Sequence, residues 1–398
     1  MNILFISSLY PSTTDADARG ITFALHSLVK YWNQEGKVIV VRPVYLYLRE
    51  LLAPKPGQQV KKTFKREMIS LDGVRVIVFP IFKIPRIAYF YYPLYRYLNK
   101  YLKSIGFVPD VVVAHYDKSL HIGYRYSRKR KLPYAAGLHI TPDLVDDNPA
   151  HFSKRCGKLL EAAAVIACRS GYIYNKVLKW FPGYQEKSFI AFSGIEENLI
   201  EEPGVGIKRM KQWKTRGKVS IISVCSLIER KKIDTNLRAL ARLKDKPDWT
   251  YTIIGDGEER GRLEALASQL GIKGRVRFKG LMSREEVIQE MKQSHIFVLV
   301  SYLETFGLVY LEAMAVGCIV IGAKGEGIDG VIEDQKNGFL SPAGEVEPLK
   351  DVLETIILRL PEDKLENILM NSHQTIIRYT DKKAAKSYWQ HLEDIIGS

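Results

Sequence analysis

The chain has 398 residues, more than one ordinary hydrophobic core accommodates and enough for two domains. Its hydrophobic fraction of 46% and charged fraction of 26% are typical of a soluble globular protein, and no apolar run reaches the ~18 residues that cross a bilayer. Residues 1–200 carry 29 Lys and Arg against 15 Asp and Glu, so nearly all of the net charge of +15 lies there. This favours an anionic partner, a nucleic acid or a membrane surface, with solubility alone as the alternative.

In the first 200 residues, short β-rich apolar runs alternate with helical patterns, which is typical of parallel sheets covered by helices. Helices are expected at Ile21–Gln34 and Ser170–Trp180. Strands are expected at Asn2–Ser7, Lys37–Arg42, Val74–Pro80, Asp110–Ala114, Pro133–Leu138, Ala163–Ala167 and Ser188–Ala191. The first strand follows no charged leader, so we interpret the N-terminus as a strand and not as a signal peptide. The basic segment from Pro203 to Lys218 looks like an interdomain connection.

The second half repeats the alternation. Strands are expected at Val219–Val224, Thr250–Ile254, Arg275–Lys279, Ile296–Val300 and Cys318–Ile321, and helices at Asp234–Leu243, Glu258–Leu270, Glu285–Gln293 and Leu308–Val316. The pattern predicts two doubly wound, Rossmann-like parallel-sheet domains, 1–200 and 201–379. Because ligands of such sheets bind beyond the carboxyl ends of the strands, we look for function in the loops that follow the strands.

The loop after Ile296–Val300 has the strongest functional pattern. Glu304 lies in the loop, Gly307 opens a helix, and Glu312 follows inside that helix. The unpaired amides of Thr305, Phe306, Gly307 and Leu308, with the helix dipole behind them, would form an anion site suited to a pyrophosphate. Glu312 lies among apolar residues, where an unpaired carboxylate would be costly, so we favour a ligand for it, such as the vicinal diol of a sugar. The alternative is that Glu304 and Glu312 are ordinary solvated carboxylates.

The segment Ser301 to Gly317 resembles the Glu-x7-Glu signature of retaining glycosyltransferases of family 4, the glycosyl transferases group 1 type. The resemblance implies a GT-B fold, in which the two domains face each other across a cleft. It also implies that Glu304 contacts the donor sugar and that Glu312 contacts the nucleotide ribose. The first domain would bind the acceptor, and the final helix, 380–398, would pack back on it.

The turn after Val219–Val224 resembles the family segment that holds the donor diphosphate. Lys231 matches the family lysine, while Cys225-Ser226 replaces the usual Gly-Arg. Arg230 is a candidate substitute for that arginine. Fixed cations are needed there because the leaving diphosphate develops negative charge. A solvated basic turn is the alternative for both residues.

Five further positions match the family motifs. Gly255 belongs to the glycine loop of the nucleotide half, and Lys279 with Gly280 matches the segment that seats the base. Gly20 belongs to the glycine loop that packs over the diphosphate. His139, after Pro133–Leu138, matches the histidine beside the donor sugar, although a lone histidine is more often structural.

We therefore expect a metal-independent hexosyltransferase without a cofactor, which moves a sugar from a UDP- or GDP-type nucleotide-diphosphate sugar to a glycan or lipid-linked acceptor. We find no D-x-D-like loop for a metal, and scattered cysteines argue against zinc. The alternatives are a related GT-B epimerase or phosphorylase, or a basic membrane- or nucleic-acid-binding protein.

The first domain also has a basic, aromatic flank. Lys83 to Lys103 contains seven aromatic residues with five interspersed cations, and Lys55 to Arg66 adds more cations. This composition suits an anionic membrane interface, while stacking on nucleic acid or an aromatic core with solvated charges are the alternatives. We expect no nucleic-acid partner and a cytoplasmic protein, peripheral on the inner face of the plasma membrane, with its four cysteines reduced.

Overall fold

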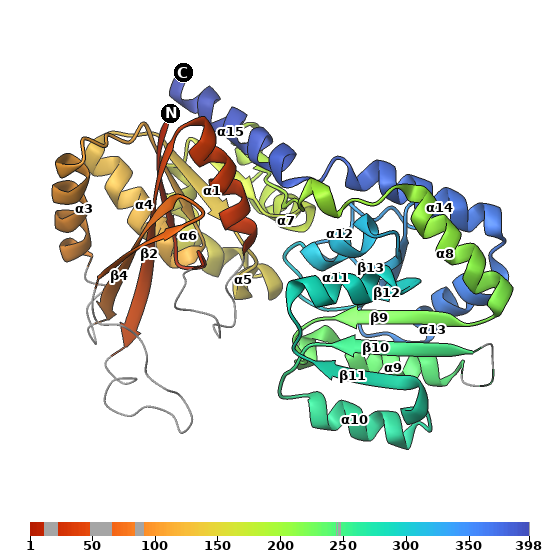
Figure 1. The fold of residues 1–398 in the computed structure, drawn as a ribbon. Helices are drawn as coiled ribbons and strands as arrows, with labels where there is room; N and C mark the ends of the chain where they lie inside the picture. Colours follow the sequence, from red (N-terminus) through yellow and green to blue (C-terminus); the bar gives the residue numbers. More distant parts are fainter. Residues whose placement is uncertain (12–22, 48–65, 84–90, 244, 246–247, 398) are drawn as a thin grey trace. The chain divides into compact units, whose positions relative to one another are not determined.

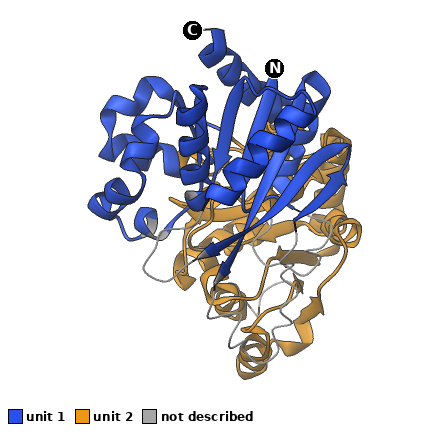
Figure 2. Cartoon of the chain, turned by 90° about the vertical axis from the view of Figure 1, so that its left-hand side faces the viewer, with its two compact units in different colours: residues 1–169, 173–191, 382–398 blue, residues 170–172, 192–381 orange. Residues whose placement is uncertain are grey.

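A computed structural model of the chain describes residues 1–11, 23–47, 66–83, 91–243, 245 and 248–397 (Figure 1). The loop with Gly20, the basic segment 55–65 and residues 84–90 of the aromatic flank lie outside the described residues. The chain forms two compact units (Figure 2). Unit 1 contains Met1–Arg169, Ile173–Ala191 and Lys382–Ser398; unit 2 contains Ser170–Tyr172 and Phe192–Asp381.

The core of unit 1 is an eight-stranded sheet in the order β3-β4-β2-β1-β5-β6-β7-β8. All neighbouring strands are parallel except β3 and β4. The residues of the central strand from Ile3 to Ile6 are fully buried, as expected for a parallel strand covered on both faces. The bounds are β1 Asn2–Ser7, β2 Lys37–Tyr47, β3 Glu67–Leu71, β4 Val74–Lys83, β5 Val111–His115, β6 Tyr134–Leu138, β7 Val165–Cys168 and β8 Ser188–Ile190.

Helices between these strands complete unit 1: α1 Phe23–Glu35, α3 Tyr92–Ser104, α4 Asp117–Arg130, α5 Pro142–Val145, α6 Pro149–Glu161 and α7 Gly171–Trp180. The last helix of the chain, α15 Asp381–Gly397, also packs on this unit. Trp32 Nε1 in α1 donates a hydrogen bond to the carbonyl of Ala385 (2.9 Å), and the Trp32 ring meets the Tyr388 ring edge-on. The C-terminal helix is thereby part of the unit 1 core.

Unit 2 has a six-stranded, fully parallel sheet in the order β11-β10-β9-β12-β13-β14. Its strands are β9 Val219–Val224, β10 Trp249–Ile254, β11 Val276–Gly280, β12 Ile296–Val298, β13 Ile319–Lys324 and β14 Phe339–Pro342. Its helices are α8 Pro203–Arg216, α9 Ile233–Ala241, α10 Arg260–Gln269, α11 Arg284–Lys292, α12 Leu308–Ala315, α13 Val346–Glu354 and α14 Glu362–Ile376.

Three features differ from the sequence-based expectation, and the first is that strand β14 was not predicted. The segment Pro203 to Lys218 is not a connection: α8 packs against α14, with Met210 and Trp213 buried. Two of its basic residues also bond to unit 2, because Arg209 Nη2 donates to the carbonyl of Gly317 (2.7 Å) and Lys214 Nζ donates to the carbonyl of Leu360 (3.1 Å). Strand β3 was not predicted, and it forms a hairpin with β4 through Asp72 and Gly73, both at positive φ. No helix among the described residues is long and apolar enough to cross a membrane.

Candidate functional site

Two neighbouring strands of unit 2 bring a cation and a carboxylate together at their carboxyl ends. Lys231 ends a short 3-10 helix, Glu229–Lys231, after β9, and Glu304 lies in the loop after β12. Lys231 Nζ and Glu304 Oε2 form an ion pair, and the two side chains are only 10% and 16% exposed. Ser301 Oγ donates to the same carboxylate oxygen (3.3 Å). Partial burial makes this attraction stronger than that of a surface pair.

Arg230 is tied to the same loop. Its carbonyl accepts a hydrogen bond from the amide of Tyr302 (2.8 Å), and its Nη1 donates to the carbonyl of Leu303 (3.3 Å). Leu303 has a φ of +60°, an uncommon conformation for a bulky residue. The basic turn after β9 therefore holds the loop that carries Glu304 in an unusual backbone shape.

The first turn of α12 offers free hydrogen-bond donors. Gly307 caps this helix with a φ of 82°. Within the described part of the chain, the amides of Thr305, Phe306, Gly307 and Leu308 have no hydrogen-bond acceptor. Free amides beside a helix dipole and a cation are features that phosphate-binding sites use, and phosphate binding by these amides stays a prediction.

Glu312 lies inside α12 and has a protein partner. Arg284, the first residue of α11, places Nη2 3.2 Å from Glu312 Oε1 and Nη1 2.9 Å from Glu196 Oε1. Burial raises the pKa of Glu312, and the positive charge of Arg284 opposes that shift. Arg284 already offsets part of the cost of burying the Glu312 carboxylate. That cost is therefore no longer a reason to expect a ligand at Glu312. Contact between Glu312 and a ribose stays a prediction.

No sequence-based prediction assigned a role to Glu326, which follows β13 at the same edge of the sheet. Its Oε2 accepts a hydrogen bond from the amide of Glu304 (3.0 Å), and the amide of Gly327 donates to the carbonyl of Glu304 (3.1 Å). A Cβ on Gly327 would lie 2.3 Å from the carbonyl oxygen of Thr305. Burial raises the pKa of Glu326. The sequence held one indication that Glu326 belongs to the site: it lies in a loop that follows a parallel strand.

Gly255 and Gly280, the glycines predicted to bind the donor, lie in contact at the carboxyl ends of β10 and β11. The amide of Gly255 donates to the carbonyl of Gly280 (2.8 Å), and a Cβ on Gly255 would lie 1.9 Å from the carbonyl oxygen of Cys225. These contacts bring the loops after β9, β10 and β11 together. Lys279 places Nζ 2.5 Å from Glu290 Oε1 on α11, and its position near the base stays a prediction. Its ammonium group is thus engaged within the protein.

His139 belongs to unit 1 and directly follows β6. It is 9% exposed, and its Nε2 lies 3.1 Å from Nδ1 of His115, the fully buried last residue of β5. Burial lowers the pKa of His139 to about 3, and the nearby positive charge of Arg169 adds to the shift. The imidazole is therefore neutral at physiological pH, which suits hydrogen bonding and not a positive charge.

Residues 207–371, within unit 2, match the family model described as "Glycosyl transferases group 1". Lipopolysaccharide core biosynthesis glycosyltransferase LpsE of Rhizobium meliloti is 32% identical over 173 residues, which are 43% of this chain and 48% of LpsE. D-inositol 3-phosphate glycosyltransferase of Streptomyces scabiei is 24% identical over 269 residues, 62% of this chain and 60% of that relative. The chain thus spans about half to three fifths of the length of these curated relatives.

One solved structure matches nearly the whole chain. Anabaena Alr3699/HepE in complex with UDP has a TM-score of 0.74 at 20% identity, and the match covers 99% of this chain and 100% of that chain. At this identity the likeness establishes the fold alone. The prediction of the fold class is therefore confirmed: the chain has two parallel-sheet α/β domains of the GT-B type.

Proposed function

We propose that the chain is a retaining glycosyltransferase that moves a sugar from a nucleotide-diphosphate sugar to an acceptor hydroxyl. The observation that carries this proposal is the Lys231–Glu304 pair beside the acceptor-free amides of Thr305 to Leu308. A cation and four amide donors suit a diphosphate, and a neighbouring carboxylate suits sugar hydroxyls. The family match of residues 207–371 supports the same assignment.

Each group of the site has a role in this reaction. The α12 amides, Lys231 and Arg230 stabilise the negative charge that the leaving diphosphate develops. Glu304 accepts hydrogen bonds from the sugar, Glu312 accepts them from the ribose, and His139 contacts the sugar. Because these fixed donors and cations supply the charge stabilisation, we propose a reaction that needs no metal ion and no cofactor.

We propose a UDP-type donor as the first choice and a GDP-type donor as the second. The preference for UDP rests on Anabaena Alr3699/HepE, whose structures contain UDP, UDP and glucose, or UDP-glucose. We propose a glycan or lipid-linked glycan as the acceptor, because LpsE is named for lipopolysaccharide core biosynthesis.

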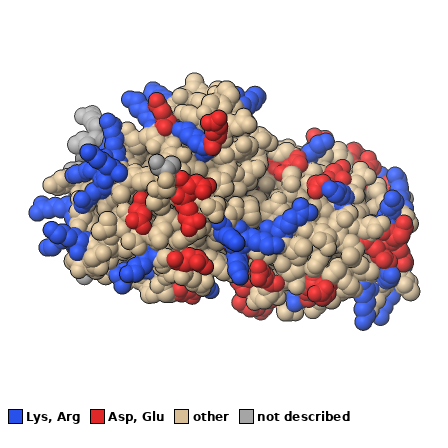
Figure 3. Space-filling view, turned by 90° about the horizontal axis from the view of Figure 1, so that it is seen from above, with Lys and Arg blue, Asp and Glu red and all other residues tan. Residues whose placement is uncertain are grey.

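We further propose that a basic edge of unit 1 contacts an anionic membrane on its cytoplasmic side. Helix α3 has no acidic residue, and Lys100 and Lys103 on it are exposed, as is Lys129 near the end of α4. Figure 3 shows Lys and Arg side chains gathered at the left, on the α3 side of unit 1. Val108, just beyond α3, is an apolar side chain that is 70% exposed. Cations beside an exposed apolar residue suit a headgroup layer.

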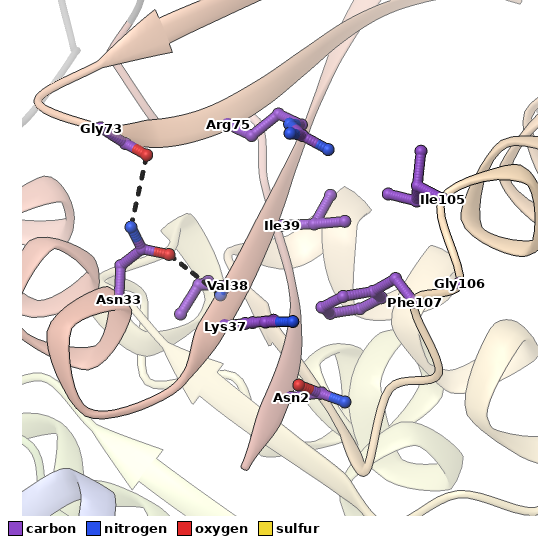
Figure 4. Close-up of a pocket in the computed structure, with 10 residues that line it drawn as sticks. All are labelled: Asn2, Asn33, Lys37, Val38, Ile39, Gly73, Arg75, Ile105, Gly106 and Phe107. Atoms are coloured by element: carbon purple, nitrogen blue, oxygen red, sulfur yellow. Dashed lines mark hydrogen bonds between the residues drawn. The ribbon is translucent and has the colours of Figure 1, made fainter.

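A pocket of about 310 Å³ in unit 1 supports the membrane proposal. Figure 4 shows it at the start of β2 and β4, with Lys37 and Arg75 on one side and Ile105 and Phe107 on the other. Two cations opposite two apolar side chains suit an anionic headgroup with the beginning of its acyl chain.

The enzymatic proposal is tested by following the anomeric proton of UDP-glucose, other UDP-sugars and GDP-mannose by NMR, with and without EDTA. We expect slow release or transfer of one sugar, with the first-formed product in the anomeric configuration of the donor, at a rate that EDTA does not change. Inverted configuration would contradict retention, loss of turnover with EDTA would contradict metal independence, and no turnover of any donor would contradict the transferase.

A further inference from the structure

Two buried aromatic side chains, His115 and Tyr388, form a hydrogen-bonded chain with His139. Nδ1 of His115 lies 3.1 Å from Nε2 of His139, and Nε2 of His115 lies 3.0 Å from the hydroxyl of Tyr388 on α15. His115 is 0% exposed and Tyr388 is 1% exposed. The chain runs from the C-terminal helix, through the end of β5, to the residue that follows β6, and all of it lies in unit 1.

The surroundings leave these side chains little freedom. The His115 ring stacks on Phe5 at 5.3 Å between centroids, and a Cβ on residue 137 would lie 2.3 Å from that ring. Tyr388 packs edge-on against Trp32 and Phe189, each at 5.0 Å. Glycine at position 137 is therefore what lets His115 reach across the edge of the sheet to His139.

The proton positions in this chain follow from the requirement that buried donors be satisfied. Among the described residues, the Tyr388 hydroxyl has a single hydrogen-bond partner, Nε2 of His115. If it only accepted, its own hydrogen would be buried without a partner, which costs about 1–3 kcal/mol. Tyr388 therefore donates to Nε2 of His115. Neutral His115 then carries its hydrogen on Nδ1 and donates to Nε2 of His139.

Burial, together with nearby positive charge, keeps the imidazoles of His115 and His139 neutral. Burial lowers the pKa of His115 well below its usual value, and His139 and Arg169 lower it further. Arg169 is itself buried beside them, and the remaining neighbours of His139 include the ring of Tyr116, which meets it edge-on. Neutral His139 with an accepting Nε2 must carry its hydrogen on Nδ1. Among the described residues, this Nδ1 has no hydrogen-bond partner.

We infer that Tyr388 and His115 are positioning residues that fix His139 as a hydrogen-bond donor, through Nδ1–H, to an oxygen of the transferred sugar. The inference rests on the proposed function for its ligand. It makes the C-terminal helix a contributor to the sugar site, through a residue that touches no substrate. It also excludes His139 as a general base, because the nitrogen available to a ligand already carries a proton.

The first test determines the tautomer directly. Protein with ¹⁵N-labelled histidine is examined by two-bond nitrogen–proton correlation NMR, which separates Nδ1–H from Nε2–H imidazoles, and His139→Gln identifies the His139 signals. We expect His139 and His115 to be Nδ1–H tautomers in the wild type, and Tyr388→Phe to shift the His139 population toward Nε2–H. An Nε2–H tautomer of His139 in the wild type overturns the inference.

The second test compares three variants for kcat and for binding of the nucleoside diphosphate. Tyr388→Phe should lower kcat about tenfold, because it releases one hydrogen bond that positions His139. His115→Asn keeps an N–H donor at the place of Nδ1 and should retain more activity than His115→Phe. In the His115→Asn background, Tyr388→Phe should have no further effect, since the amide donates without help from Tyr388.

These outcomes separate the two proposals. Binding of the nucleoside diphosphate should stay unchanged in all variants, because its predicted contacts lie in unit 2. If the wild type transfers no sugar and binds no nucleotide, the proposed function fails and the sugar contact fails with it. If the wild type is active and folded Tyr388→Phe keeps its full kcat and its His139 tautomer, only the positioning inference is overturned.

Discussion

Lys231 and Glu304 are 73 residues apart in the sequence and form an ion pair at the carboxyl ends of the adjacent strands β9 and β12. A family motif predicted each of them, but no motif predicted that they would meet. In the proposed reaction each residue gains a second partner: Lys231 binds a phosphate oxygen, and Glu304 binds a sugar hydroxyl. The pair therefore keeps both side chains in place before the donor arrives.

Removing either member of this pair should affect turnover far more than folding. Lys231→Ala and Glu304→Gln should each lower kcat/KM for the donor by about 10² or more, because each removes a preorganised charge or acceptor at the reacting centre. The matched control is Lys336→Ala, which breaks the exposed pair with Glu333 in the same unit. Steady-state kinetics with the accepted donor make the comparison.

An active Lys231→Ala variant, with kcat/KM within about threefold of the Lys336→Ala control, would contradict the assignment. It would show that the Lys231–Glu304 pair is structural. The control itself should lose little, because an exposed pair such as Lys336–Glu333 contributes only about 0–1 kcal/mol.

Glu326 should matter through the loop that it holds. Glu326→Ala removes the acceptor of the Glu304 amide and should lower kcat about tenfold, while Glu326→Gln keeps one oxygen acceptor and should retain most of the activity. The control is Glu333→Ala on the surface of the same unit. Equal losses in Glu326→Ala and Glu326→Gln would indicate that the negative charge is needed and not the hydrogen bond.

The close approach at Gly255 gives a prediction about stability. Gly255→Ala should lower the free energy of unfolding by about 2 kcal/mol or more, because its φ of 125° is strained for alanine and a Cβ would strike the Cys225 carbonyl. Gly261→Ala, in α10 with open space around it, should instead stabilise the protein by about 0.5–1 kcal/mol. Urea unfolding of both variants tests the contrast, and equal stabilities would refute it.

The buried histidines should make the protein sensitive to acid. The pKa of His139 falls from 6.5 to about 3 on folding, so between these values the unfolded chain binds a proton that the native chain does not. The free energy of unfolding should therefore decrease as pH is lowered from 6.5, by up to about 1.4 kcal/mol per pH unit for this group. His139→Gln should flatten that dependence, and an unchanged pH dependence in this variant would contradict the assignment.

The membrane proposal predicts binding that depends on lipid charge. Vesicles of phosphatidylglycerol and phosphatidylcholine should bind the wild type more tightly than pure phosphatidylcholine, and added salt should weaken the binding. Replacing Lys100, Lys103 and Lys129 with Gln should weaken it about a hundredfold, from roughly 1 kcal/mol per lysine. Replacing the exposed unit 2 cations Lys208, Arg238 and Lys273 should change little. Equal losses of vesicle binding in both triple variants would show that net charge causes the binding. That result would contradict a specific membrane-binding face on unit 1.

The sequence predicted most parallel strands because their residues are apolar on both faces. Strand β1, for example, has the predicted bounds, Asn2–Ser7. Strand β3 was missed because an exposed edge strand has no such run, and its residues are half-buried or exposed. Helix α8 was missed because its basic residues outnumber its apolar ones, and its burial depends on α14, far away in the sequence.

The residues of the candidate site also fall into those that the sequence predicted and those that it did not. Motifs identify residues that a ligand would touch, such as Lys231 and Glu304, because the chemistry of the ligand requires those side-chain types. They do not identify residues that act through others. Glu326, His115 and Tyr388 become visible only when the fold places them against Glu304 and His139.

Calorimetric titration of the wild type with UDP, GDP and ADP, repeated on Lys231→Ala and Lys336→Ala, tests the central claim most directly. We expect the wild type and Lys336→Ala to bind one nucleotide, UDP first, with equal affinity, and Lys231→Ala to bind it at least tenfold more weakly, because a charge-assisted phosphate contact contributes about 1.5–3 kcal/mol. Binding of that nucleotide with full affinity by Lys231→Ala, or no binding of any nucleotide by the wild type, would contradict a donor site at the carboxyl ends of β9 and β12.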